Sequence, residues 1–450
     1  MPLPPARLSS RPIPSLRLMA RFPNLKPLAL CLALTGLSSA APTFLDLPTT
    51  MRLAGARNDD IALARSKHAE AIADSRTAWQ RFWPSLSLAA ASRGHQGRVQ
   101  DIGGAVFDAS KQQYTLGGAL LVDWSPGEIY YSALAANQHA LAAGELAEAA
   151  RKDILLKAID RYYSLLAAEA SLAVASDDLQ LSDNYAAQLN AATTTGTAFR
   201  ADFLRASLAS TRLRLALGKA SESRDLAAAN LAETLRLPPL SELRPAKSDL
   251  VPVTLSSPSS ILSLLNLAAA SRPELRAAAA NLSAASIDSD RARLAPLFPS
   301  VNAGYSLGAL GGGRDGQWAS PRDSHDLFLG LTWKIGPGGI FDTQRKKTAA
   351  LQQHRATLTE RSLQASIANE VVSAATKAAS AANQIRLCDK AVADATEILT
   401  LASQRKASEI GAVADVILAR DEVSRARQAR IQSVTDFNKA QHELRRATGQ

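Results

Sequence analysis

The chain has 450 residues, of which 46% are hydrophobic and 20% are charged, and its formal net charge is +10. Half of that excess lies in the first 40 residues, which carry five basic side chains and no acid, so the remainder is only mildly basic. There the lysines and arginines are interspersed with acids along helical segments. A nucleic-acid-binding protein would gather them on one face, so this class is disfavoured.

Residues 1–40 are predicted to be a secretory signal. Their basic residues precede the apolar run Leu28 to Leu37, and Ser38-Ser39-Ala40 then supplies the small residues that a signal peptidase requires. A transmembrane anchor is the alternative, but ten apolar residues are too few to cross a bilayer as a helix. Met19 is an alternative start, because the segment that follows it has conventional signal proportions.

The two cysteines cannot form a disulfide in the mature chain. Cys31 lies inside the predicted signal, which leaves Cys388 alone. Acylation of Cys31 is disfavoured because Leu30 occupies the position where bacterial lipoprotein signals have a small residue.

An internal duplication organises the rest of the sequence. Seven residues recur at a constant separation of 215, and Gly196 and Gly411 have the same spacing. The identical pairs are Ala62/Ala277, Ala64/Ala279, Ala69/Ala284, Ile72/Ile287, Arg76/Arg291, Pro84/Pro299 and Ser85/Ser300. The sequence therefore predicts a first repeat over 41–235 and a second over 261–450, together forming one domain rather than two or three separate globular ones. A proline-rich joint over 236–260, a linker expected to have small elements of its own, connects them.

Each repeat is expected to begin with a helix and continue into two strands. Residues 50–83 are alanine-rich and helical in character, and Pro84 marks a change to period-two alternation. Apolar residues alternate with small or polar ones over Tyr114 to Trp124, over 301–308 and over 327–334. Strands of about ten residues match the length that crosses a membrane when tilted, whereas a soluble hairpin is the alternative interpretation.

Four aromatic residues are predicted to lie at the lipid interface of these strands, namely Tyr114, Trp124, Tyr305 and Trp333. The polar segments Arg93 to Gln113 and Leu310 to Ser324 are expected to be exposed loops.

Very long helices should follow the strands. No proline interrupts residues 127–194, and three packing seams have the spacing of coiled coils. The seams comprise Leu155, Ile159, Tyr162 and Leu166; Leu204, Leu208, Thr211 and Leu215; and Ile367, Val371, Ala374 and Ala378. Alanines beside them allow close approach of helices, although a soluble helical bundle would show similar seams.

These features resemble TolC-type outer-membrane efflux proteins over nearly the whole mature chain. The resemblance is carried by Arg272-Pro273-Glu274-Leu275, by Phe298-Pro299-Ser300-Val301 and by Trp83-Pro84-Ser85-Leu86. Asn58 and Asp59 look like the start of the first repeat, and Trp333 through Phe341 resembles the strand-to-helix return.

The resemblance implies an α+β membrane protein. Duplicated long helical hairpins would form a trimeric α-barrel tunnel, and each protomer would give four transmembrane β-strands to a shared 12-stranded β-barrel. Four strands cannot close a barrel alone and lipid does not tolerate open sheet edges, which independently requires oligomerisation.

The implied function is an outer-membrane channel, the exit duct of a tripartite efflux or type I secretion system in a Gram-negative bacterium. Its partners would be two further copies, outer-membrane lipid, a periplasmic adaptor (membrane fusion) protein and an inner-membrane transporter. Drugs, metal ions and polypeptides are all compatible cargoes.

In this family each half has a turn at the periplasmic tip, where a glycine begins the turn and an aspartate lies near the entrance constriction. The matching positions are Gly196 with Asp202 and Gly411 with Asp415, and the second turn is two residues tighter. Helix capping is the alternative role of both aspartates. Three basic residues are close enough in sequence to pair with tip carboxylates: Arg200, Arg405 and Lys406.

The sequence gives little support for an enzymatic function. The six histidines are scattered without metal-ligand spacing, the glycine-rich segments lack the lysine of a phosphate loop, and no nucleophile elbow is present. We therefore expect no catalytic residue, cofactor or metal. A soluble periplasmic coiled-coil adaptor is the principal alternative, and a secreted hydrolase with helical decorations is a weaker one.

Overall fold

The computed structural model describes residues 43–56, 58–238, 241–246, 249–255, 260–314, 321–408 and 411–450. The predicted signal over 1–40, with its alternative start at Met19, lies outside the described residues. The first repeat contains β1 (Thr43–Leu45), α1 (Leu47–Ala56), α2 (Asp59–Gln80), β2 (Ser85–Gln100), β3 (Val106–Trp124), α3 (Pro126–Thr194) and α4 (Arg200–Leu235). Beyond it lie β4 (Leu243–Pro245), α5 (Ile261–Ser271), α6 (Pro273–Leu294), η1 (Ala295–Leu297), β5 (Ser300–Arg314), β6 (Arg322–Thr332), α7 (Thr343–Ala407) and α8 (Val413–Ala447).

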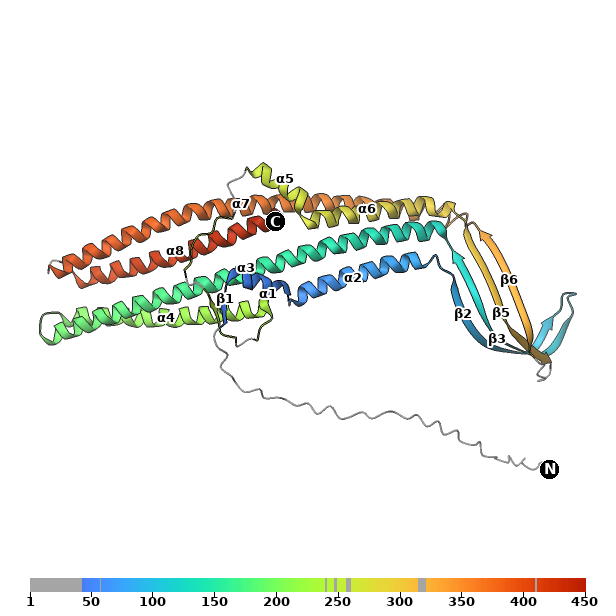
Figure 1. The fold of residues 1–450 in the computed structure, drawn as a ribbon, viewed down its shortest axis with the longest axis horizontal. Coiled ribbons are helices and arrows are strands. Elements are labelled where there is room, and N and C mark those ends of the chain that lie inside the picture. Colours follow the sequence, from blue (N-terminus) through green and yellow to red (C-terminus); the bar gives the residue numbers. More distant parts are fainter. Residues whose placement is uncertain are drawn as a thin grey trace, which may run out of the picture. The chain divides into compact units, whose positions relative to one another are not determined.

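The order of elements from α2 to α4 recurs from α6 to α8. Ser85 and Ser300, which begin β2 and β5, are separated by the same 215 residues that separate the identical pairs of the sequence. Each half thus consists of a short helix, a strand hairpin and a pair of long antiparallel helices, as Figure 1 shows.

The longest helix begins and ends almost where its sequence predicts. Pro126 occupies the first turn of α3, where its missing N–H costs nothing, and the helix continues for 69 residues. It packs against α2, α4, α6 and α8 (Figure 1). Ile159, Tyr162 and Leu166 of its predicted seam are buried, which confirms this part of the prediction.

Of the other two predicted seams, one is buried and one is exposed. Ile367, Val371, Ala374 and Ala378 on α7 are all buried, as predicted. The prediction for α4 is wrong within the protomer, because Leu204, Leu208 and Leu215 are 54%, 52% and 67% exposed. The α4 helix instead turns Ala206 and Ser210 inward. Small residues allow α3 and α4 to approach closely, and the leucine stripe is left on the outside.

The single helical stretch expected over 50–83 is two helices. Asn58 adopts an extended conformation, and its side-chain oxygen accepts a hydrogen bond from the Asp60 backbone N–H at 2.9 Å. The same side chain donates to the Thr234 carbonyl at 3.2 Å, which ties the start of α2 to the end of α4.

The proline-rich joint does carry a small element. Residues of β4 pair in parallel with β1, and Leu45 and Leu243 are buried with Leu231 and Leu235 of α4. This cluster fastens the beginning of the described chain to the first pair of long helices.

The four longer strands form one antiparallel sheet in the order β2-β3-β5-β6. The expectation of loops over Arg93–Gln113 and Leu310–Ser324 is wrong for most of those residues, since β2 extends to Gln100, β3 starts at Val106 and β5 extends to Arg314. Both faces of these extensions are polar, so they lack the apolar alternation that signals a strand, although their backbones pair as in any hairpin.

Across the described residues, none of the helices combines the length and the apolarity needed to span a bilayer.

Candidate functional site

The sheet presents two chemically different faces. Residues directly opposite one another on paired strands share a face, and the register runs without a bulge from β2 to β6. One face, here called the apolar face, carries Leu86, Leu88, Leu116, Leu120, Val122, Trp124, Val301, Ala303, Tyr305, Leu307, Leu327, Leu329 and Leu331. The other, here called the polar face, carries mainly serine, alanine, glycine and threonine, with Asp123 and Asp326.

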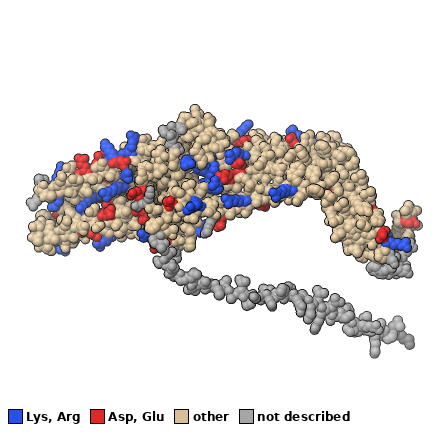
Figure 2. Space-filling view, in the orientation of Figure 1, with Lys and Arg blue, Asp and Glu red and all other residues tan. Residues whose placement is uncertain are grey.

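No layer formed by the described residues covers the apolar face. Leu88 is 83% exposed and Leu327 is 81% exposed, although leucines on a sheet are ordinarily buried against a core. Figure 2 shows that charged side chains lie over the helices and at the tip of the sheet, with an uncharged zone between them. An exposed apolar area of this kind marks a surface that another apolar partner or lipid covers.

The register places the four predicted interface aromatics. Tyr114 and Trp124 lie on the apolar face ten residues apart on β3, about 33 Å of strand, which after tilting is close to the ~25 Å apolar band of membrane strands. Trp333 directly follows β6 and is 51% exposed. Tyr305 lies opposite Leu120 and Leu327, so it occupies the middle of the apolar face rather than an end.

Both edges of the sheet are unpaired within the described chain. Strands β2 and β6 each have a single neighbour, and β2 exposes a backbone edge 16 residues long. Unpaired N–H and C=O groups next to an apolar face cannot be left in lipid, so strands from outside the protomer must complete the sheet if it enters a membrane.

The turn between α3 and α4 forms the first helical tip. Gly196 has φ +78°, a conformation that glycine adopts without steric cost. Four threonine hydroxyls, those of Thr193, Thr194, Thr195 and Thr197, donate to the last carbonyls of α3. Carbonyl oxygens in the last turn of this 69-residue helix thereby gain hydrogen-bond donors without a partner protein.

Asp202 lies in the first turn of α4 but does not cap it. Its carboxylate forms an ion pair with Arg205 at 3.2 Å, and no side chain caps the amides of this helix start. Arg200, the sequence-predicted partner, is exposed and forms no ion pair with the described residues.

The second tip joins α7 to α8. The Gly411 N–H donates to the Arg405 carbonyl at 3.0 Å, and Asp415 stands exposed in the first turn of α8. Its carboxylate has no hydrogen-bond or ion-pair partner among the described residues, and α8 has no side-chain cap. Arg405 and Lys406 likewise form no ion pair there. The tip charges around Asp415 thus have no partner in the part of the chain that the structure describes.

The two tips pack against each other through residues that sequence reasoning missed. Leu189 of α3, Ala206 of α4 and Val413 of α8 are buried together. Nearby, the Arg420 guanidinium lies 4.7 Å from the centre of the Tyr185 ring and donates to the Leu181 carbonyl at 2.8 Å. Burial lowers the pKa of Arg420 and raises that of Tyr185. No sequence motif marks this contact, because it joins α3 to α8 across 235 residues.

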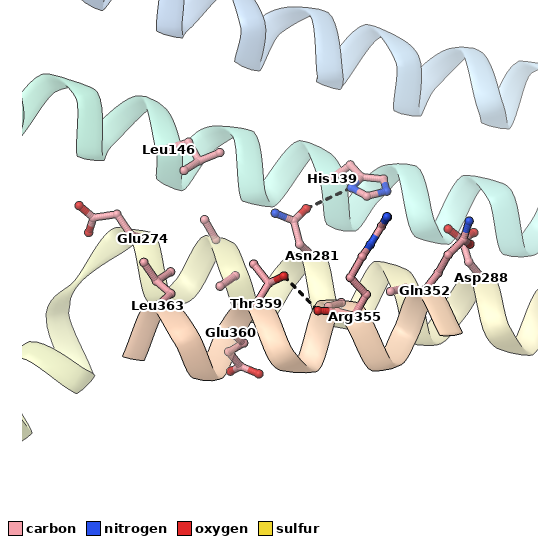
Figure 3. A pocket seen from close by; sticks show the side chains of 14 residues that line it. His139, Leu146, Glu274, Asn281, Asp288, Gln352, Arg355, Thr359, Glu360 and Leu363 are labelled. Carbon is pink, nitrogen blue, oxygen red and sulfur yellow. Dashed lines mark hydrogen bonds between the residues drawn. The ribbon is translucent and has the colours of Figure 1, made fainter. Parts of the chain in front are cut away.

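A groove of about 550 Å³ lies between α3, α6 and α7. Figure 3 shows His139 on α3 facing Asn281 on α6, with 3.2 Å between the His139 Nδ1 and the Asn281 Oδ1. Arg355 and Thr359 line it from α7. The described residues contain no group of three or more His, Cys, Asp or Glu side chains that could hold a metal ion.

Comparisons with known proteins agree with this arrangement. Residues 264–450 match the family model described as outer membrane efflux protein. A membrane protein from Pseudomonas aeruginosa has a TM-score of 0.78 at 21% identity, covering 92% of this chain and 98% of its own. The CmeC outer membrane channel of Campylobacter jejuni has a TM-score of 0.77 at 16% identity, covering 90% and 85%.

The outer membrane protein VceC from Vibrio cholerae has a TM-score of 0.74 at 18% identity, covering 90% of this chain and 96% of its own. Comparison with curated protein sequences gives no significant match. At these identities the solved structures show a common fold. Residues 264–450 are similar to outer membrane efflux proteins, and the chain shares the fold of these membrane proteins of known structure.

Proposed function

We propose that three copies of this chain form a passive exit duct across the outer membrane of a Gram-negative bacterium. Each copy would supply its 4-stranded sheet to a closed barrel of 12 strands, and α3, α4, α7 and α8 would continue the wall into the periplasm. The apolar face would contact lipid and the polar face would line the lumen, the distribution that membrane barrels require.

The observation that carries this proposal is the combination of an uncovered apolar face with two unpaired edges. Either feature alone fits a protein-protein interface, and both together favour a lipid-facing sheet that neighbouring copies close. A threefold arrangement also brings the exposed leucines of α4 against a helix of the next copy, since they have no partner within the protomer.

The tips would form the periplasmic entrance. Threefold symmetry would turn Asp415 into a ring of three carboxylates, which attracts cations and repels anions across a narrow opening. Arg200, Arg405 and Lys406 form no ion pair with the residues that the structure describes and would be available to tip carboxylates of a neighbouring copy or of a periplasmic adaptor.

The duct would act with an adaptor and an inner-membrane transporter of a tripartite efflux or type I secretion system. The transporter would supply the energy and select the cargo, because the proposed duct is a passive pore.

The adaptor alternative is less well supported by the sheet. A soluble adaptor would need its strands to pack on a core, whereas Leu86, Leu88, Leu327 and Leu329 are each more than 70% exposed.

Membrane extraction separates the two functions. Mature protein in isolated outer membranes should resist carbonate and high salt, dissolve in detergent and have the mass of a trimer by light scattering. Release by carbonate as a monomer would contradict the duct and favour the adaptor.

A further inference from the structure

The distal end of the sheet, formed by Arg93–Gln100 and Val106–Gln113 with the start of β6, carries basic residues on its polar face. Arg93 on β2, Lys111 on β3 and Arg322 on β6 are all exposed. They come from three different strands, so no single sequence segment shows them as a group.

The register assigns all three to the same face. Arg93 lies opposite Gln113, two positions from Lys111, which makes Arg93 and Lys111 diagonal neighbours. Arg322 lies opposite Leu310, which lies opposite Thr115, two positions from Gln113. Since no bulge interrupts any ladder, these side chains project to the same side as Ser87, Gly117 and Ser306.

No described acid neutralises this group. Asp108 lies directly opposite Arg98, and both project to the other side of the sheet, as does Asp323. Asp101 lies in the turn, where its carboxylate accepts a hydrogen bond from the Ala105 N–H at 2.8 Å. None of the three basic residues forms an ion pair within the described chain.

The acids of the polar face lie closer to the helices. Asp123 stands one residue before the end of β3, and Asp326 lies opposite Ser306. The polar face therefore changes sign along the strands, from acidic near the helices to basic at the distal end.

We infer that Arg93, Lys111 and Arg322 form a cationic collar at the outer mouth of the duct, which binds multivalent anions and favours the exit of anionic cargo. This inference rests on the proposed function, because only closure of three sheets turns three residues per copy into a ring of nine positive charges around a lumen. Rings of Lys and Arg are the usual selectivity device of anion and phosphate pores.

The test is block of single-channel current by sodium tripolyphosphate in planar bilayers. Wild-type channels should be blocked from one side of the membrane only, which is the side that the distal end of the sheet faces. The triple variant Arg93→Gln/Lys111→Gln/Arg322→Gln should lose about tenfold or more in blocker affinity, since it removes the positive charges that attract the polyanion to the mouth.

Arg98→Gln is the matched control, because Arg98 belongs to the same hairpin but projects to the opposite side. It should leave the block unchanged, and trimer mass in detergent should be equal in all three proteins. A second readout is the reversal potential in a KCl gradient, which should move toward cation selectivity in the triple variant alone.

Two results would overturn the inference in distinguishable ways. Conducting channels whose block and reversal potential are the same in wild type and triple variant would reject the collar and leave the duct intact. Wild-type protein that forms no conducting channel would reject the duct, and the collar with it.

Discussion

Arg446 in the last turn of α8 and Glu274 in the first turn of α6 form an ion pair that joins the end of the chain to the start of the second repeat. Burial alone would raise the pKa of Glu274, but the hydrogen bond from Arg446 and the charges of Arg446 and Arg272 outweigh it and lower the pKa. Arg446 also donates to Asp153 of α3 at 2.8 Å, so one guanidinium connects three helices.

Replacing Arg446 with Met should destabilise the folded protein by about 3–5 kcal/mol, because it leaves the half-buried Glu274 carboxylate without its main partner. The midpoint of thermal unfolding in detergent measures the loss. The double variant Arg446→Met/Glu274→Leu should recover much of it, since an apolar pair replaces the ion pair. A single variant as stable as wild type would show that the ion pair is energetically neutral.

Stability should fall as the pH is lowered from 6.5 toward 4, because burial lowers the pKa of His442 to about 4. In that range the unfolded chain binds a proton that the folded chain does not, so acid favours unfolding, by on the order of 2 kcal/mol. The His442 ring packs on Tyr163 with 5.8 Å between centres. His442→Phe should keep this contact and flatten the pH dependence of the unfolding midpoint over that range; an unchanged slope would assign it to other groups.

The close approach of β3 and β5 depends on glycine. Gly117 and Gly308 lie directly opposite, and a Cβ on Gly308 would meet the Leu116 carbonyl oxygen and lie 2.8 Å from the Gly117 Cα. Gly308→Val should therefore prevent the sheet from forming and abolish trimers in detergent extracts. Gly94→Val on β2 is the control, because a Cβ there has no neighbour within 4 Å. Equal trimer yields from both variants would refute the steric argument.

The exposed leucines of α4 predict a contact between copies. Leu208→Glu should convert trimers to monomers in detergent, because a charge buried between helices without a partner costs several kcal/mol, whereas Leu208→Met should preserve the trimer. Mass by light scattering distinguishes the two. If the Glu variant remains trimeric, this stripe faces solvent or another protein.

The entrance proposal predicts that Asp415→Ala raises single-channel conductance and weakens block by divalent cations added on the tip side. Removing three carboxylates from a narrow ring frees the opening from bound cations that obstruct it. Asp202→Ala is the comparison, because the Asp202 carboxylate already pairs with Arg205. Unchanged conductance and unchanged cation block in Asp415→Ala would remove this residue from the constriction.

The sequence alone predicts the duplication, the order of elements and the long helices. A constant spacing of 215 and the proline-free run over 127–194 can be read directly along the chain, and the hydrogen bonds of an α-helix join residues only four apart. It also determined which residues alternate over Tyr114 to Trp124, since alternation in a strand is a period of two.

Which side chains meet depends on strand register and helix packing, which the sequence does not show. The register put Arg93, Lys111 and Arg322 on one face, and packing turned Ala206 inward while leaving Leu208 exposed. The polar extensions of the strands were not predicted, because a strand with solvent-exposed polar residues on both faces lacks the apolar alternation that indicates a strand. Contacts such as Arg420 with Tyr185 join helices 235 residues apart, and such pairs follow from how helices pack rather than from any pattern along the chain.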